Sequence, residues 1–260
     1  MGRRPRGFVG VRGPDAEAYL QRMVSNDVAL DPGASCEALL LTAKARVIAP
    51  LVVLRRGHED FLLATEPQLR DRVLAELRRF RFAAKCELEP EEHDSFLLLA
   101  AEPPTESLAY ANAELGVPAW EVLDAAPPAG LPELADEELE RLRILTRSPR
   151  FGAELDDRVL PAEAGLEERM ISFTKGCYPG QEPVARLHHR GHANRGLRVL
   201  VLEEAVEPDA ELEHDGKSVG RVTSVAPDGE GGFVALAYVR HEVPAETSLT
   251  VGRLSAGQLH

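Results

Sequence analysis

The chain has 260 residues, 44% of them hydrophobic, and a formal net charge of -13. A chain of this size can bury a sizeable core in one large domain or in two to three small ones. Its acidic balance repels phosphate backbones and anionic lipid headgroups, so we expect no direct nucleic-acid partner and no membrane partner. The three cysteines are far apart and form no Cys-X-X-Cys pair, which argues against a disulfide framework and against a zinc cage.

The N-terminus and the hydropathy of the chain indicate where in the cell the protein is found. The N-terminus is basic but lacks the apolar segment of a signal peptide. No stretch approaches the roughly 20 apolar residues that span a bilayer. We therefore expect a soluble protein of the cytoplasm.

The first hundred residues alternate short strands with helices. Apolar runs predict strands at residues 8–11, 37–42, 46–54, 61–65, 83–90 and 95–101. Apolar residues at helical spacing follow Pro14 and Pro67, which predicts helices within residues 12–27 and over 67–80. The connections are too short for repeated parallel crossovers, so the order favours an antiparallel α+β fold.

The pattern of predicted helices and strands changes twice after the first hundred residues. A short helix is expected at 105–115, a strand around Trp120 and another helix from Asp136 to Arg147. After His192, short strands separated by turn residues predict a small C-terminal antiparallel β-barrel. We expect a first α+β domain formed by residues 1–47 with 147–194, a second formed by 48–146, and the barrel over 195–260.

The segment KGCYPGQE, residues 175–182, is the strongest candidate for a reactive site. Gly176 and Gly180 flank the Cys177 region, so the backbone can turn sharply and present the thiol in a loop. Nearby guanidinium groups favour a thiolate, which makes Cys177 a candidate reactive thiol. Cys36 and Cys86 lie in strand-like runs and are expected to be small buried apolar side chains.

A cationic run follows this segment, and it allows several interpretations. No acidic side chain occurs between Glu182 and Glu203, whereas this stretch contains Arg186, His188, His189, Arg190, His192, Arg195 and Arg198. The run can form a local anion site beside the thiol, or a solvated face that pairs with surplus carboxylates. A histidine pair four residues apart binds metal only on a helix, and Gly191 argues against one, so no metal site is expected. A cysteine hydrolase is also conceivable, but no nucleophile-elbow signature surrounds Cys177.

The segment KGCYPGQEPVAR, with FGAELDDRVLPAEAGLEERMISF before it, closely resembles the signature region of YgfZ-type folate-binding proteins. The stretch VRGPDAEAYLQRMVSNDV resembles the N-terminal helix and Asn-Asp turn of the same superfamily, and VGRVTSVA with FVALAYV resembles its C-terminal barrel. The resemblance covers nearly the whole chain. One departure is Ala45, in the turn TAKAR, where relatives commonly carry glycine.

The resemblance implies a fold, a ligand and a set of site residues. The fold is two antiparallel α+β domains and a small barrel around a central cavity that binds tetrahydrofolate or a derivative. The implied role is to sustain iron-sulfur enzymes, including a tRNA-modifying radical enzyme, through transient contact with iron-sulfur proteins or the cluster-assembly machinery. Carried onto this chain, the catalytic residues are Cys177 and Lys175, the other motif residues are Gly176, Tyr178, Gly180, Gln181, Glu182 and Arg186, and the folate-binding residues are Asn26, Asp27, Glu163 and Arg190.

The related aminomethyltransferases of glycine cleavage are the alternative. They carry an acidic pair in the strand corresponding to residues 46–54, where this chain has Ala49 and Pro50. They also carry an asparagine-rich turn where this chain has residues 65–67, Thr-Glu-Pro, and they lack the cysteine of the KGCYPGQE type. We therefore expect no aminomethyl transfer. Whether Cys177 acts as a nucleophile, as a transient cluster ligand or as a redox thiol stays open, because a stable cluster needs about four thiolate ligands.

Overall fold

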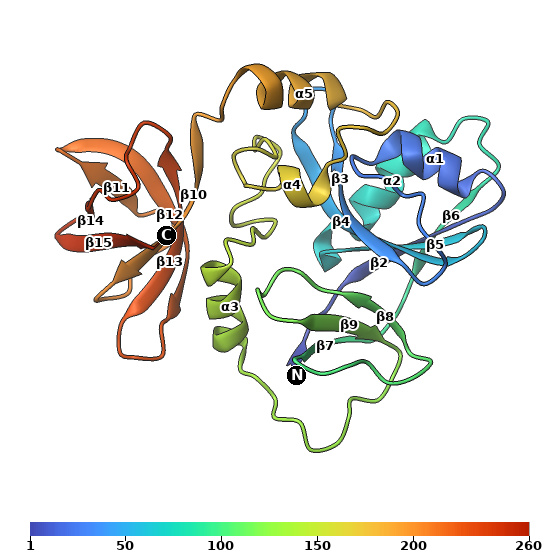
Figure 1. Cartoon of the computed structure of the whole chain (residues 1–260), viewed down its shortest axis with the longest axis horizontal. Coiled ribbons are helices and arrows are strands. Elements are labelled where there is room, and N and C mark those ends of the chain that lie inside the picture. Colours follow the sequence, from blue (N-terminus) through green and yellow to red (C-terminus); the bar gives the residue numbers. More distant parts are fainter. Residues whose placement is uncertain (260) are drawn as a thin grey trace.

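Two sheets and a closed barrel organise the chain in the computed structural model (Figure 1), which describes residues 1–259 and only the backbone of Arg190. The first sheet has five strands in the order β3-β4-β5-β2-β6, and the second has four in the order β1-β7-β9-β8. Neighbouring strands are antiparallel in both sheets and in the barrel. The predicted fold class is confirmed: antiparallel α+β structure followed by a C-terminal barrel.

The five-stranded sheet carries two helices on one face. Its strands are β2 (Gly7–Arg12), β3 (Ser35–Leu41), β4 (Val47–Gly57), β5 (Asp60–Thr65) and β6 (Glu87–Glu91); the helices are α1 (Ala16–Met23) and α2 (Arg70–Phe80), the latter after a 3-10 turn, η1 (Pro67–Leu69). Val9 and Val11, two residues apart, point to the helical face and pack with Tyr19, Leu20 and Leu77 in one buried cluster. This strand-helix packing explains why both periodicities are readable in the sequence.

The opposite face of the same strands is also buried, against the second sheet. That sheet comprises β1 (Gly2–Arg3), β7 (Ser95–Leu99), β8 (Leu108–Ala111) and β9 (Ala119–Leu123). Phe8 and Leu62 from the first sheet pack with Tyr110 and Leu123 from the second. Because β4 and β5 are buried on both faces, they read as continuous apolar runs rather than as alternating patterns.

The helix expected at residues 105–115 is wrong. The chain there forms β8, which pairs with β9 along Ala109↔Val122 and its neighbours. Tyr110 is 2% exposed and its burial between the sheets outweighs the helix propensity of the surrounding alanine and glutamate residues. The expected strand around Trp120 is confirmed as β9.

The closed barrel begins at Arg195, where the sequence predicts it. Its strands are β10 (Arg195–Leu202), β11 (Glu211–His214), β12 (Lys217–Pro227), β13 (Phe233–Arg240), β14 (Leu249–Val251) and β15 (Leu254–Leu259), of which β15 was not expected. Along β13, Ala235 and Ala237 point into the barrel core, whereas Leu236 and Tyr238 pack against the segment before the barrel. Alternation along one strand therefore attaches the barrel to the rest of the molecule.

Three helices lie between the sheets and the barrel: α3 (Asp136–Leu145), α4 (Glu167–Met170) and α5 (Gln181–Arg190). The helix α5 overturns the expectation that Gly191 prevents a helix there. Gly191 lies directly after the last turn with extended backbone, so it ends the helix instead of breaking it. His192 lies beyond that end, and His188 and His192 therefore do not share a helix.

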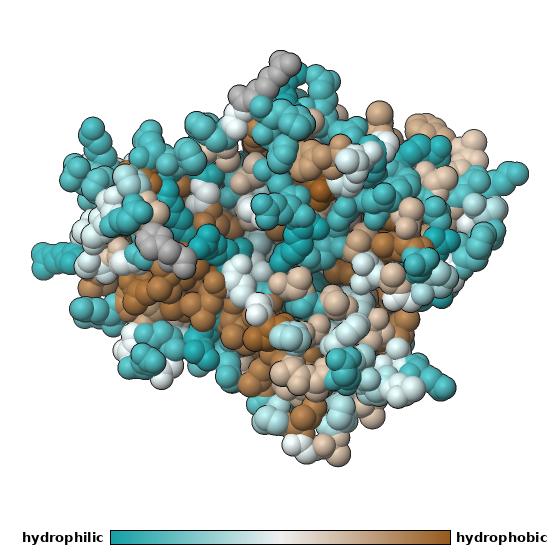
Figure 2. Space-filling model, viewed as in Figure 1, coloured by the Kyte–Doolittle hydropathy of each residue, from teal (hydrophilic) through white to brown (hydrophobic). Residues whose placement is uncertain are grey.

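The sheets do not follow the expected division of the chain between residues 47 and 48. The strand β4 begins at Val47 and pairs with β3 on one side and β5 on the other. A division that follows hydrogen-bonded sheets places the whole five-stranded sheet in one unit. Figure 2 shows hydrophilic side chains over α5 and apolar ones gathered lower on the same face, over the barrel and α3.

Candidate functional site

The loop between α4 and α5 carries the KGCYPGQE motif and is anchored at its start by Lys175. The Lys175 ammonium donates hydrogen bonds to the carbonyl oxygens of Val24 and Asn26, at 2.8 and 2.6 Å. These carbonyls follow the last turn of α1, where backbone acceptors lack helical partners. Burial lowers the pKa of Lys175 to about 8, an effect that Asp27 opposes. Lys175 therefore fastens the loop to the α1–β3 connection.

The end of the loop is fixed by Gly180. Its φ of +86° is in the left-handed region, and a Cβ at this position would lie 2.6 Å from the carbonyl oxygen of Thr42 and 3.1 Å from the Cα of Ala45. Only glycine fits this close approach without strain. Ala45 itself has a φ of +59°, which accounts for the glycine expected there from the resemblance. The two backbone turns are packed directly against each other.

Between these anchors, Cys177 is exposed and Tyr178 is buried. The ring of Tyr178 lies 5.6 Å from the Lys175 ammonium, within range of a cation–π contact. Cys86 is buried, as expected, and Cys36 is half-buried against the same core. Burial raises the pKa of Cys36 to about 12, so this thiol stays protonated at neutral pH. The exposed thiol of the chain is Cys177.

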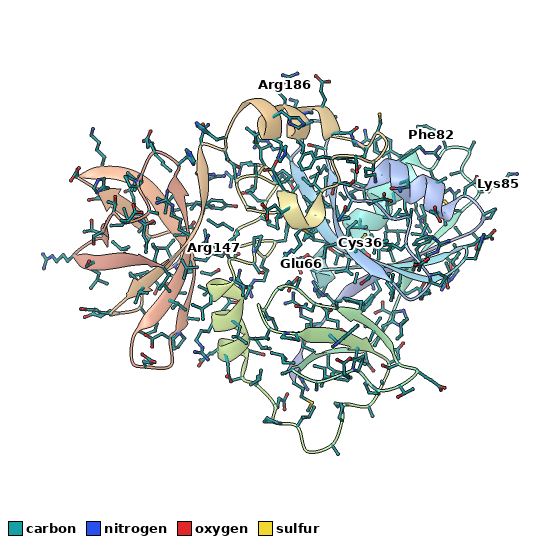
Figure 3. All side chains as sticks on the ribbon, viewed as in Figure 1. Cys36, Glu66, Phe82, Lys85, Arg147 and Arg186 are labelled. Atoms are coloured by element: carbon teal, nitrogen blue, oxygen red, sulfur yellow. The ribbon has the colours of Figure 1, made fainter. Side chains whose placement is uncertain are left out.

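The cations after the motif are dispersed over several partners. Arg186 pairs with Glu182 one helical turn away at 2.7 Å, and Figure 3 shows it pointing outward from α5. His188 stacks on Phe173 with ring centroids 4.0 Å apart. Arg195 bonds to Glu163 at 3.2 Å. The side chain of Arg190 lies outside the described residues, so its role near the thiol stays a prediction.

The other residues predicted to bind folate are engaged with the protein itself. Asn26 donates to the carbonyl of Glu37 at 2.8 Å and accepts from the Asp27 amide. The Ala29 amide bonds to Asp27 and helps to lower the pKa of that carboxyl. Glu163, besides its bond with Arg195, accepts from the Leu160 amide. Their roles in folate binding remain predictions.

A cavity of about 320 Å³ lies away from the motif, between β1, η1, α3 and the loop before Phe151. Its lining is rich in charge and includes Arg3, Arg4, Arg6, Glu66, Glu114, Glu140, Arg143 and Arg150. A smaller cavity of about 20 Å³ shares Arg6, Glu66, Glu114 and Pro149 with it and reaches Pro50 on β4. Ligand sites of small molecules usually start at about this combined size. Sequence reasoning did not identify these residues.

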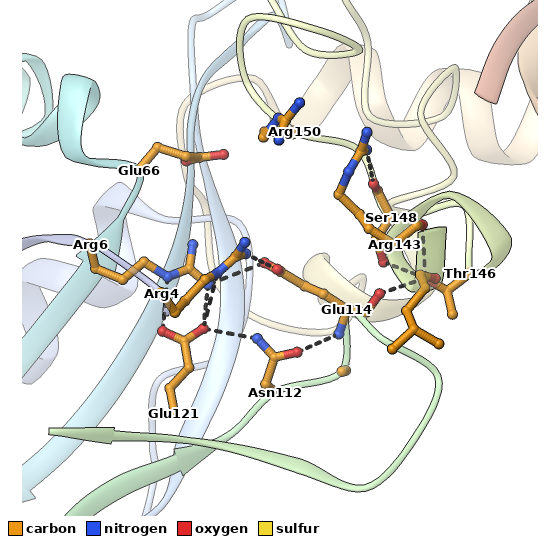
Figure 4. Close-up of polar contacts among 12 residues, drawn as sticks. Arg4, Arg6, Glu66, Asn112, Glu114, Glu121, Arg143, Thr146, Ser148 and Arg150 are labelled. Carbon is orange, nitrogen blue, oxygen red and sulfur yellow. Dashed lines mark hydrogen bonds and ion pairs between the residues drawn. The ribbon is translucent and has the colours of Figure 1, made fainter. Parts of the chain in front are cut away.

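The floor of the cavity is a buried ionic network (Figure 4). Glu121 on β9 is fully buried and accepts from Arg6 at 2.9 Å, Tyr110 at 2.6 Å and Asn112 at 2.9 Å. Burial by itself raises the pKa of Glu121, but Arg6 and Arg4 outweigh it and lower this pKa to about 2. The two carboxylate oxygens of Glu121 together accept four hydrogen bonds, two of them from Arg6, so the network holds Arg6 in place.

The opposite wall connects the cavity to the barrel. Arg143 of α3 bonds to Glu154 at 2.9 Å and to Ser224 of β12 at 2.7 Å, and Glu154 also accepts from Ser224 at 2.6 Å. Tyr238 of β13 donates to the carbonyl of Glu154 at 2.9 Å. This buried cluster fixes the α3 wall relative to the barrel.

The described residues offer neither a cluster of metal-binding side chains nor a membrane-spanning helix. No group of three or more His, Cys, Asp or Glu side chains in residues 1–259 is placed to hold a metal ion. None of the helices in the described part of the chain is long and apolar enough to cross a membrane.

Comparison with known proteins shows relatives that match most of the chain. The chain is 26% identical over 276 residues to the tRNA-modifying protein YgfZ of Pectobacterium atrosepticum, covering 92% of this chain and 83% of that protein. It is 27% identical over 281 residues to the mitochondrial iron-sulfur cluster assembly factor IBA57 of Mus musculus, covering 91% and 76%. The chain is thus similar over most of its length to YgfZ and IBA57 proteins. No protein-family model matches the chain.

The fold of this chain is aminomethyltransferase-like. The crystal structure of the glycine cleavage system aminomethyltransferase T from Bartonella henselae superimposes with a TM-score of 0.82, covering 98% of this chain and 82% of that one. The sequences are 19% identical over the match, so this likeness concerns the fold alone.

Proposed function

We propose that this protein binds a reduced folate and supports the assembly or repair of iron-sulfur clusters in client enzymes of the cytoplasm, with Cys177 as its reactive group. The observation that carries the proposal is the anchored loop: Lys175 and Gly180 fix both ends while the thiol between them stays exposed. Relatives named as iron-sulfur cluster assembly factors and tRNA-modifying proteins support the same role.

An exposed thiol on a fixed loop suits transient chemistry with a partner. One thiolate cannot hold a cluster that requires about four such ligands, so any cluster contact of Cys177 would be shared with a client protein. Lys175 would then act as a positioning residue, because two of its three donor hydrogens already bond to backbone carbonyls.

The folate part of the proposal rests on the family resemblance and on the cavity between the sheets. Arg3 and Arg150, on its lining, can pair with the carboxylates of a glutamyl tail. The partly buried pair of Arg4 with Glu114 and the buried pair of Arg6 with Glu121 keep the cavity walls rigid in advance of binding.

Folate-dependent aminomethyl transfer is the second candidate, because the chain shares the fold of an aminomethyltransferase. On β4, however, Ala49 is buried and Pro50 lines the smaller cavity, so neither position offers a carboxylate for acid–base catalysis. We therefore expect no methylenetetrahydrofolate production from an aminomethylated lipoyl carrier. Production at a normal enzymatic rate in a coupled assay would favour this second function.

The proposed function is tested in two steps. Calorimetry with mono- and polyglutamyl tetrahydrofolate should show saturable binding, and no heat and no thermal stabilisation would contradict the folate role. In cells lacking the native protein, Cys177→Ser should fail to restore the activity of iron-sulfur enzymes, whereas the matched control Cys36→Ala should restore it. Full restoration by Cys177→Ser at native expression levels would make the loop a structural turn.

A further inference from the structure

Glu66 is a carboxylate on the wall shared by both cavities that the proposed function does not yet use. It follows the last residue of β5, and Pro67 after it begins η1, which keeps the backbone of Glu66 extended with φ −63° and ψ 145°. Its side chain therefore leaves the sheet edge instead of joining a helix. Figure 4 shows the carboxylate directed into the space bounded by Arg4, Arg6 and Arg150.

The charge of Glu66 is not neutralised by an ion pair, in contrast to the arginines around it. Arg4 and Arg6 are bound to Glu114 and Glu121. Glu66 makes no ion pair within 4.0 Å among the side chains that the structure describes. Its Oε1 accepts from the Phe151 amide at 3.2 Å, and its Oε2 has only a long contact, 3.4 Å, from the neighbouring threonine hydroxyl. One carboxylate oxygen thus keeps its capacity to accept a strong hydrogen bond.

The strand β4, which pairs with β5, carries no carboxylate at positions 49 and 50, close to Glu66. The strands β4 and β5 pair with Val52 opposite Ala64, and the Thr65 hydroxyl donates to the carbonyl of Pro50 at 2.8 Å. Pro50 and Glu66 consequently lie side by side on the wall of the smaller cavity. Positions 49 and 50 offer no acidic side chain to a ligand at this point. Of the three carboxylates that line the smaller cavity, Glu37 and Glu114 are paired with arginines, which leaves Glu66 as the one without an ion pair among the described side chains.

We propose that Glu66 accepts a hydrogen bond from a ring N–H that only a reduced pterin carries, and so makes the cavity select reduced over oxidised folates. This inference rests on the proposed folate-binding function. A tetrahydropterin carries hydrogens on N5 and N8, whereas the oxidised ring presents lone pairs at both nitrogens, which a carboxylate oxygen repels. The two-donor edge of the pyrimidine ring is the same in both oxidation states, and the single free oxygen of Glu66 suits one donor.

The test compares Glu66→Gln with the wild type in binding two probes, tetrahydrofolate and folic acid, under anaerobic conditions. The wild type should bind tetrahydrofolate at least tenfold more tightly than folic acid, because a site built for an N–H donor rejects the analogue that lacks it. In Glu66→Gln the carboxamide can turn its NH₂ toward a ring lone pair. Its affinity for tetrahydrofolate should fall about tenfold and its preference should disappear. The amide of Phe151 can still bond to the carboxamide oxygen, so the melting temperature should stay within a few degrees.

A matched control and three outcomes make the test decisive. Glu89→Gln changes an exposed carboxylate on β6 that lines neither cavity, and it should keep the wild-type preference. If the wild type binds tetrahydrofolate but Glu66→Gln keeps the same preference, the role of Glu66 is refuted while folate binding stands. If the wild type binds tetrahydrofolate and folic acid with equal affinity, the proposed role of Glu66 is refuted without any variant. Failure of the wild type to bind either probe would instead contradict the proposed function.

Discussion

Replacing Lys175 by methionine separates a positioning role from a chemical one. The substitution keeps most of the apolar stem and removes the ammonium that donates to the carbonyls of Val24 and Asn26. Because burial lowers the pKa of Lys175, desolvation offsets the gain from its charge, and the loss on substitution comes from two carbonyl oxygens left without a donor, at roughly 1–3 kcal/mol for each one that is buried. We expect Lys175→Met to lower the free energy of unfolding by about 2 kcal/mol. For a chain of this size, that lowers the melting temperature by about 4–8 °C.

The pH dependence of Lys175 adds a second signature. Burial lowers its pKa from 10.5 to about 8, so between these values the unfolded chain binds more protons than the native protein. Stability therefore rises with pH through this window in the wild type, and the rise is absent in Lys175→Met. Because the side chain is half-buried, solvent screening limits the contribution to about 1 kcal/mol.

The assay is denaturant unfolding from pH 7 to 9.5, together with restoration of iron-sulfur enzyme activity in cells. Lys44→Met, at an exposed position in the turn that faces Gly180, is the matched control and should change stability by no more than about 0.5 kcal/mol. If Lys175→Met melts like the wild type yet fails to restore activity, the positioning role is refuted and Lys175 takes part in the chemistry.

Four further substitutions have expected outcomes in thermal or chemical unfolding. Cys177→Ser should cost less than about 1 kcal/mol, because the thiol is exposed and buries little apolar area; a larger loss would make it a structural residue. Gly180→Ala should cost about 2 kcal/mol or more, whereas Ala45→Gly should remain within about 1 kcal/mol of the wild type; equal effects would contradict the close packing of the two turns. Glu121→Ala should cost about 3–5 kcal/mol, because it removes the fully buried carboxylate that accepts two hydrogen bonds from Arg6 and leaves that guanidinium with Glu114 alone. With its pKa lowered to about 2, Glu121 stabilises the native state above pH 4.5, and this contribution is lost as the pH falls toward 2, so the variant should show a weaker loss of stability on acidification.

Much of the fold could be predicted because its elements have local signals. Alternation and apolar runs placed β2, β4, β5 and β13, and the start of the barrel at Arg195 followed from a change in strand spacing. The prediction of a helix at 105–115 was wrong because the burial of Tyr110 depends on a second sheet, which the local sequence pattern does not reveal. The expectation that no helix precedes Gly191 was wrong because a glycine can end a helix as well as exclude one.

The candidate site was only half readable from the sequence. Glycines on both sides of Cys177 indicated an exposed loop, and a glutamate inside the apolar strand AWEVL was an overlooked signal of the buried network around Glu121. The partners of Lys175 lie about 150 positions away in the chain, and Glu66 meets Phe151 across 85 positions.

The sequence by itself determined the acidic surface, the order of strands and helices, and the loop that exposes Cys177, since net charge, periodicity and glycine placement act over a few residues. Only the tertiary structure decided that Lys175 donates to backbone carbonyls, that Arg186 pairs within its own helix, and that Glu66 lines a cavity and makes no ion pair with the side chains that the structure describes. The reason is that the energy of a charged group depends on which distant groups share its low-dielectric surroundings, and packing alone brings those groups together.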